Sequence, residues 1–261
     1  WVGMLAGGAV AAGYGLCLGG VTFRYDIRGS YFVLVTLAFA ELLLYLFVNV
    51  DAVGGASGVV KPLPDAYGAE FGLVAFQFPG RLPYYYIVLA FLVVVTLVAL
   101  LLRRSQTGLY LHAIRDDEDA ARAVGIPTVR YKLFALVLSA FFTAWAGAFW
   151  AMYFPSIRPG MVFGVLVSID IVLPAAIGGI GTVAGPIVGA FALEIISELG
   201  RQAVEFPELQ NVVGGVVLLL VVLKSPGGLV SLPGKAAALV DRLNGETRSV
   251  WDRDSSRAED D

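Results

Sequence analysis

The stretch "PYYYIVLAFLVVVTLVALLL" (83–102) runs for 20 residues without Asp, Glu, Lys or Arg. A helix needs roughly 20 apolar residues to cross the hydrocarbon core of a bilayer. Because lipid cannot satisfy backbone polar groups, such a run is expected to cross as a helix. Comparable runs predict an all-α, polytopic transmembrane helical bundle of about six to seven spans or half-spans. The other runs cover about 1–23, 29–50, 131–153, 162–180 and 183–200, with a shorter one at about 211–224.

The composition supports this fold class. Hydrophobic residues make up 58% of the 261 residues, charged residues make up 15%, and the mean hydropathy is +0.79. Soluble domains are about one-quarter charged, so an integral membrane protein is favoured. Cys17 is the only cysteine in the sequence, which excludes an internal disulfide and a cysteine metal cluster. The formal net charge of -3 argues against nucleic acid as a partner.

The Lys and Arg residues predict the orientation, because short cytoplasmic loops are rich in them. With the 103–130 loop in the cytoplasm and seven alternating spans, 14 of the 18 Lys and Arg residues lie inside. The four that lie outside are Lys61, Arg81, Arg158 and Arg201. The opposite orientation would place most basic residues outside and is therefore disfavoured.

Two loops and a tail complete the predicted organisation. Residues 1–232 form the transmembrane domain, with a cytoplasmic coupling loop at 103–130 and an external loop at 51–82. The external loop contains "VGGASG" and three prolines, and we expect it to form an external cap or a short half-helix. The polar residues 233–261 end in "SSRAEDD" and are expected to form a disordered cytoplasmic tail.

The segment "AIRDDEDAARAVGI" (113–126) predicts a capped helix within the 103–130 loop. Asp116 is expected to cap its beginning by accepting a hydrogen bond from the amide of Asp119. Gly125 stands where a helix commonly ends in a left-handed residue, and Pro127 follows shortly after to prevent continuation. A generic polar loop would need none of this order.

The predicted helix has a polar side and a small, apolar side. Glu118 and Arg122 stand four residues apart, in the favourable order for a surface ion pair. Small side chains allow close approach of a neighbouring backbone, so this shape favours docking into a groove of a cytoplasmic partner. The alternative is a solvated helical loop that contacts no partner. The residues of the apolar side are Ile114, Ala120, Ala121 and Val124.

Four carboxylates, Glu41, Asp170, Glu194 and Glu198, lie inside the predicted apolar spans, where charges usually face a bundle interior or an aqueous path. Glu41 lies about half-way along the 29–50 run, and Asp170 lies near the middle of the 162–180 run. Together with Thr36, they are the candidates for a polar path. The alternative is an interhelical hydrogen bond, or a carboxyl kept neutral by burial.

Three glycines, Gly181, Gly185 and Gly189, recur at intervals of four. This spacing is typical of a close crossing between helices. Pro186 favours a different interpretation, a turn at 178–185 followed by a new helix, because proline is common at the first helical position. We favour the turn, and in either case these glycines are structural.

Several ordered blocks resemble one family. The block "GLYLHAIRDDEDAARAVGI" (108–126) is similar to the coupling segment of the permeases of branched-chain amino acid ABC transporters. The blocks "RGSYFVLVTLAFAE" (28–41), "GGIGTVAGPIVGA" (178–190) and "SPGGL" (225–229) resemble the same family, as does 129–151. The positions of the first block that match in register are Gly108, Ala113, Ile114, Arg115, Glu118, Ala120, Ala121, Gly125 and Ile126.

The chain also departs from the family pattern. Leu109 and His112 stand where the family often has arginines, and His112 is expected to be a loop contact. An early Gly-Gln-Ser-Leu-Gly-His-like motif is absent, and the sequence opens on Trp1 within an apolar run. We therefore expect that N-terminal spans of the family are missing from this sequence.

The resemblance implies a function and a set of partners. It implies the permease subunit of an importer for branched-chain or related amino acids in the cytoplasmic membrane, driven by ATP hydrolysis on a separate subunit. Cytoplasmic ATP-binding cassette subunits would bind ATP and Mg, and a second homologous permease and an external substrate-binding protein would complete the assembly in the lipid bilayer. The residues implied in ATPase coupling are Arg115, Glu118, Ala120, Ala121, Val124 and Gly125.

The sequence has no Gly-x-x-x-x-Gly-Lys-Ser/Thr phosphate loop, since its only Gly-Lys, at 234–235, is followed by Ala. The sequence also shows no motif that pairs a nucleophile with a base. We therefore expect that this chain is not an enzyme and that it carries no cofactor or metal. A stand-alone secondary transporter or channel for a small polar solute is the alternative. Within ABC importers, urea or short amides are alternative substrates.

Overall fold

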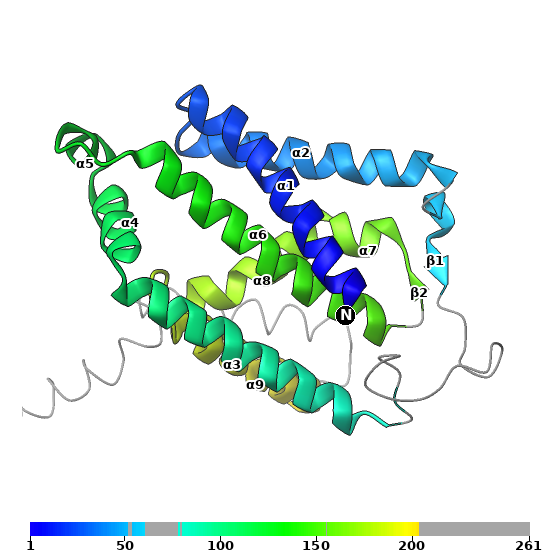
Figure 1. Ribbon diagram of the computed structural model, residues 1–261. Helices are drawn as coiled ribbons and strands as arrows, with labels where there is room; N and C mark the ends of the chain where they lie inside the picture. The colour runs from blue at the N-terminus through cyan, green and yellow to red at the C-terminus, as the bar shows by residue number, and fades with distance from the viewer. Residues whose placement is uncertain (52–53, 61–77, 79, 155, 204–261) are drawn as a thin grey trace, which may run out of the picture. The chain divides into compact units, whose positions relative to one another are not determined.

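The computed structural model describes residues 1–51, 54–60, 78, 80–154 and 156–203 (Figure 1). Helices dominate this part of the chain, as the sequence predicts. Its one strand pair is antiparallel, with β1 (Val59–Val60) beside β2 (Ser156–Ile157). The α-helices are α1 (Val2–Arg24), α2 (Ser30–Asn49), α3 (Leu82–Arg104), α4 (Gln106–Asp116), α5 (Glu118–Ala123), α6 (Thr128–Tyr153), α7 (Pro159–Phe163), α8 (Val165–Gly178) and α9 (Gly185–Ala203).

Among the described residues, five helical segments are long and apolar enough to cross a membrane. Four are single helices, α1, α2, α3 and α6, and the fifth is Pro159–Gly178, which joins α7 and α8. Five of the predicted runs are therefore confirmed as helices of a length and composition that can span a membrane. Helix α9 is not among these segments, so the span predicted at 183–200 is not supported, and it carries two glutamates and an arginine. The run at 211–224 lies outside the described residues.

The described residues fall into two compact units, which divide between Ser168 and Ile169. In the first unit, α1 packs along α6 more extensively than any other pair of described elements. Small residues on α1 allow this approach: an added Cβ at Gly8 would lie 2.7 Å from the Phe141 ring. One at Gly15 would lie 3.2 Å from the Cβ of Ala140. These two helices form the core of the first unit.

Replacing Gly8 with valine is expected to destabilise the α1–α6 pair. Bulk added to a packed contact typically costs about 1–3 kcal/mol, and the aromatic rings of Phe141 and Trp145 leave no flexible neighbour to yield. Gly7→Val is the matched control, because nothing lies within 4 Å of a Cβ built there. Thermal unfolding in detergent should show a lower midpoint for Gly8→Val alone. Equal midpoints for the two variants would contradict this packing.

The described part of the predicted 51–82 loop contains a single 3-10 turn, η2 (Gly55–Ser57), followed by β1. Val59 lies opposite Ile157 in the strand pair, so the loop is tied to the connection between α6 and α7. The expected half-helix is not seen at 54–60. Residues 52–53, 61–77 and 79 of this loop lie outside the described residues.

In the second unit, the end of α8 and the beginning of α9 meet at a tight turn. The Thr182 hydroxyl donates to the Gly179 carbonyl at 3.0 Å and accepts from the amide of Gly185 at 2.9 Å. This confirms the predicted turn. The close helix approach is present as well, because an added Cβ at Gly189 would clash with the Pro174 carbonyl oxygen. The turn and the close helix approach therefore occur together, because the turn folds α9 back against α8.

Candidate functional site

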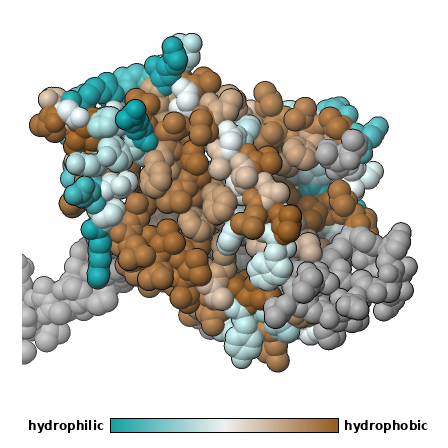
Figure 2. All heavy atoms as spheres, in the orientation of Figure 1, coloured by the Kyte–Doolittle hydropathy of each residue, from teal (hydrophilic) through white to brown (hydrophobic). Residues whose placement is uncertain are grey.

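The charged segment folds as two helices, α4 and α5, where the sequence analysis expected one. Ser105 ends α3 and caps α4, since its hydroxyl accepts from the amide of Gly108 at 3.3 Å. A Cβ at Gly108 would clash with the Leu102 carbonyl oxygen, so glycine lets α4 begin directly beside the end of α3. Figure 2 shows hydrophilic residues gathered at the end of the first unit where Figure 1 places α4 and α5.

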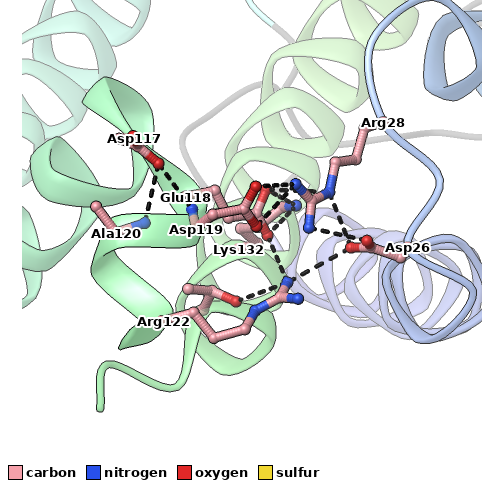
Figure 3. Close-up of polar contacts among 9 residues, drawn as sticks. Asp26, Arg28, Asp117, Glu118, Asp119, Ala120, Arg122 and Lys132 are labelled. Carbon is pink, nitrogen blue, oxygen red and sulfur yellow. Dashed lines mark hydrogen bonds and ion pairs between the residues drawn. The ribbon is translucent and has the colours of Figure 1, made fainter. Parts of the chain in front are cut away.

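The cap of α5 is Asp117, and the prediction of Asp116 is wrong. The Oδ1 atom of Asp117 accepts from the amides of Asp119 and Ala120, both at 2.9 Å (Figure 3). Asp116 is the last residue of α4, so its backbone is helical and cannot serve as the extended first residue of the next helix. Asp117 has φ -154 and ψ 109, and this break separates the two helices.

The end of α5 confirms the prediction for Gly125. Its φ is +88, which strongly favours glycine. The amide of Gly125 donates to the Arg122 carbonyl at 3.0 Å, and the amide of Ile126 donates to the Ala121 carbonyl at 3.1 Å. This pair of hydrogen bonds is the Schellman motif, which satisfies carbonyls that the helix leaves unpaired.

The apolar face predicted for this segment is not continuous. Ala121 is only 4% exposed and packs inside its own chain, whereas Val124 is 77% exposed and Ala120 is also exposed. Ile114 is buried too, but it belongs to α4. Of the predicted apolar face, Ala120 on α5 and Val124 directly after its end are therefore exposed, and Ala121 anchors the helix from within.

Glu118 is the centre of an ion-pair cluster, which comprises Asp26, Arg28, Glu118, Asp119, Arg122 and Lys132 (Figure 3). Its carboxylate lies 3.1 Å from Arg122, which confirms the predicted pair at i and i+4. It also lies 3.0 Å from Nζ of Lys132 on α6 and 3.8 Å from Arg28. The Glu118 side chain is 16% exposed, so these attractions are screened less than those of a surface pair.

The α1–α2 turn (residues 25–29) contributes the other side of the cluster. The Arg28 guanidinium lies 2.8 Å from Asp26 and donates from one nitrogen to both carboxylate oxygens of Asp119, at 3.1 and 3.3 Å. Asp26 also accepts from Arg122 at 3.4 Å. The hydrogen bond from Arg28 holds the pKa of Asp26 below its ordinary value. The bonds to Asp26 and then Asp119 raise the pKa of Arg28.

The turn itself is shaped to hold these side chains in place. Asp26 has φ 52, an uncommon conformation in which Asp is enriched among non-glycine residues. The amide of Ile27 donates to the Thr22 carbonyl at 3.0 Å, and that of Asp26 donates to the Phe23 carbonyl at 3.3 Å. Helix α1 therefore ends in the same motif as α5. Lys132, a member of the cluster, also places its Nζ 4.8 Å from the centre of the Phe23 ring.

Sequence reasoning missed Asp26, Arg28 and Lys132 as members of this site. Asp119 follows Arg28 by 91 residues, and no local periodicity connects the two. The one available signal was that Arg28 opens a block that resembles the family. Arg115, predicted to take part in coupling, is exposed in the last turn of α4.

The pathway candidates fall in two places. Thr36 and Glu41 lie half-buried on α2 in the first unit, and the Thr36 hydroxyl donates to the Val33 carbonyl of its own helix at 2.9 Å. Asp170 is exposed on α8 in the second unit. Two of the candidates thus share one helix and the third belongs to the other unit, and the role of all three in a solute path stays a prediction. Within the described ranges, no group of His, Cys, Asp or Glu is arranged to hold a metal ion.

Long apolar helices joined by a structured, charged segment define an integral membrane protein. The family described as "Branched-chain amino acid transport system / permease component" matches residues 1–222. The chain belongs to this family.

Curated relatives agree with the assignment. The chain is 30% identical over 250 residues to the "High-affinity branched-chain amino acid transport system permease protein LivM" of Escherichia coli strain K12 and of Salmonella typhimurium strain LT2, covering 89% of this chain. It spans only 57% of the length of these relatives. It is 28% identical to the "L-arabinose transport system permease protein AraH" of Escherichia coli strain K12, covering 85% of this chain and 65% of AraH. No solved structure matches the chain.

Proposed function

We propose that the protein is the membrane-spanning subunit of an ABC importer for branched-chain or related amino acids. The family match over residues 1–222 is the observation that carries this proposal. Helix α5 supports it, because a capped helix followed directly by the exposed Val124 suits the docking of a second protein. A stand-alone transporter or channel would leave such a surface unused.

The proposed orientation places α4, α5 and the α1–α2 turn in the cytoplasm. The balance of Lys and Arg residues in the connecting segments supports this assignment. The protein is then a multi-pass protein of the cytoplasmic membrane, with β1 and β2 on the external side. Residues 233–261, which lie outside the described part, are proposed to be a cytoplasmic tail.

The proposed partners are those of an ABC importer. ATP-binding cassette subunits would dock at α5 and bind ATP and Mg, since this sequence has no phosphate-binding loop. A second homologous permease and an external substrate-binding protein would complete the transporter. The proposal gives this chain no catalytic residue and no cofactor of its own.

The substrate is proposed from the names of relatives. Two of these name branched-chain amino acids, while AraH names L-arabinose. Uptake of labelled leucine, measured beside labelled arabinose and urea in the complete transporter, distinguishes these classes. Thr36 and Glu41 on α2, and Asp170 on α8, are proposed to line the path of the solute.

A photo-activated cross-linking residue at Val124 tests the docking surface and its orientation together. Because Val124 directly follows α5 and is 77% exposed, the probe should capture the ATP-binding subunit when the complete transporter is irradiated. The same probe at Val93, 59% exposed on the apolar helix α3, is the control and should not capture it. Capture from Val93 but not from Val124 would overturn the proposal.

A further inference from the structure

We propose that Arg28 in the α1–α2 turn is a positioning residue for α5, so that a movement of α5 is passed directly to α2. This inference rests on the proposed function, in which ATP hydrolysis by the partner moves α5. The contact of Arg28 adds a second path by which a movement of α5 reaches the apolar helices, since α5 is already joined to α6 by the connection at 124–127.

The contacts of Arg28 carry the first step. Its guanidinium bridges Asp26 on its own turn, at 2.8 Å, and Asp119 on α5, at 3.1 Å. A guanidinium held between two carboxylates is restricted in orientation as well as in distance, because its donors form a planar fork. Arg28 therefore holds α5 against the turn in one geometry (Figure 3).

The backbone beside Arg28 carries the second step. Gly29 follows immediately and is the residue before α2, with its carbonyl accepting from the amide of Phe32 at 3.2 Å. On the other side of Arg28, the motif that ends α1 extends through Asp26 and Ile27. The side chain that contacts α5 thus belongs to a residue only two positions before the start of α2. A displacement of α5 is therefore expected to displace the beginning of α2 as well.

The attachment of α5 to α6 differs in kind, whereas the hydrogen bond from Arg122 to Asp26 joins α5 to the same turn as Arg28 does. Glu118 pairs with Lys132, which lies on α6, the helix that follows α5 in sequence. A contact between neighbours along the chain would exist in most arrangements of this loop. The pair between Arg28 and Asp119 instead joins α5 to a helix that is remote in sequence, and α2 is the helix that carries Thr36 and Glu41.

Charge reversal tests the inference in the complete transporter. Asp119 is 74% exposed, so its pair with Arg28 is too weak to hold the fold but suffices to position a helix. Arg28→Glu should retain ATPase recruitment and basal hydrolysis, while solute moved per ATP falls by about two- to fivefold. Asp119→Arg alters the docking helix itself, so its effect is measured by hydrogen exchange in the permease alone. The double variant of Arg28→Glu with Asp119→Arg restores opposite charges at these two positions and should recover part of the loss, because a glutamate at position 28 still faces Asp26 and Glu118. Arg24→Glu, an exposed arginine at the end of α1, is the matched control and should change little.

Three results would overturn the inference. The first is unchanged solute movement per ATP in Arg28→Glu. The second is failure of the double variant to recover. The third is loss of ATPase recruitment in Arg28→Glu, which would make the turn part of the docking surface itself.

A measurement on the permease alone separates this inference from the proposed function. Hydrogen exchange of the amides at 118–123, in lipid nanodiscs without ATPase, should be faster in Arg28→Glu and partly restored in the double variant. If the wild-type protein recruits no ATPase, the proposed function fails, and the exchange data still decide whether Arg28 positions α5. Unchanged exchange in Arg28→Glu would show that it does not.

Discussion

Replacing Ala121 with tryptophan is expected to detach α5 from the rest of its own chain. The Ala121 side chain is 4% exposed in a helix that packs against α4 and α6, so the larger ring has no space. Overpacking of this kind costs about 1–3 kcal/mol, a large fraction of the stability of a six-residue helix held by tertiary contacts. Hydrogen exchange at 118–123 should accelerate by about tenfold or more.

Val124→Trp is the matched control for this prediction. Val124 lies three residues later on the same segment but is 77% exposed, so the ring can remain in solvent and α5 should keep its native exchange. Both variants should lose recruitment of the proposed ATPase subunit, for different reasons. Ala121→Trp loses the structure of α5, and Val124→Trp obstructs the surface that α5 presents. Native exchange in Ala121→Trp would contradict the burial of this side chain.

Replacing Glu118 with glutamine is expected to loosen the whole ion-pair cluster. Three cations converge on this carboxylate, and the neutral amide would leave Arg122 and Lys132 beside each other without their shared partner. Hydrogen bonds to charged groups contribute about 1.5–3 kcal/mol, and partial exposure of Arg122 reduces this to about 1–2 kcal/mol. Hydrogen exchange at 118–123 should become faster, and solute movement per ATP should fall.

Asp116→Asn removes the same charge two residues earlier and serves as the control. Asp116 is exposed at the end of α4, so its substitution should alter neither quantity by more than about twofold. If the two variants behave alike, net charge rather than the geometry around Glu118 governs the segment. High salt offers a second comparison, because it weakens exposed pairs such as Arg28 with Asp119 more than the less exposed pair of Glu118 with Lys132.

The amino-acid sequence by itself determined the long helices and much of the local design of α5. The run at 83–102 became α3 because an apolar stretch of that length satisfies its own backbone only as a helix. The pair of Glu118 with Arg122 and the left-handed Gly125 were also predictable. Each depends only on residues within about one helical turn, where sequence spacing equals spatial proximity.

Only the tertiary structure decided how the charged segment is attached to the other helices and which of its side chains are exposed. The extended backbone at Asp117 divides one predicted helix into α4 and α5, and this rotates Ala121 inward and leaves Val124 outside. Arg28 meets Asp119 because α1 and α6 pack along each other and bring the α1–α2 turn beside α5. Side-chain direction and long-range pairing follow from the packing of whole helices, which spacing along the chain does not encode.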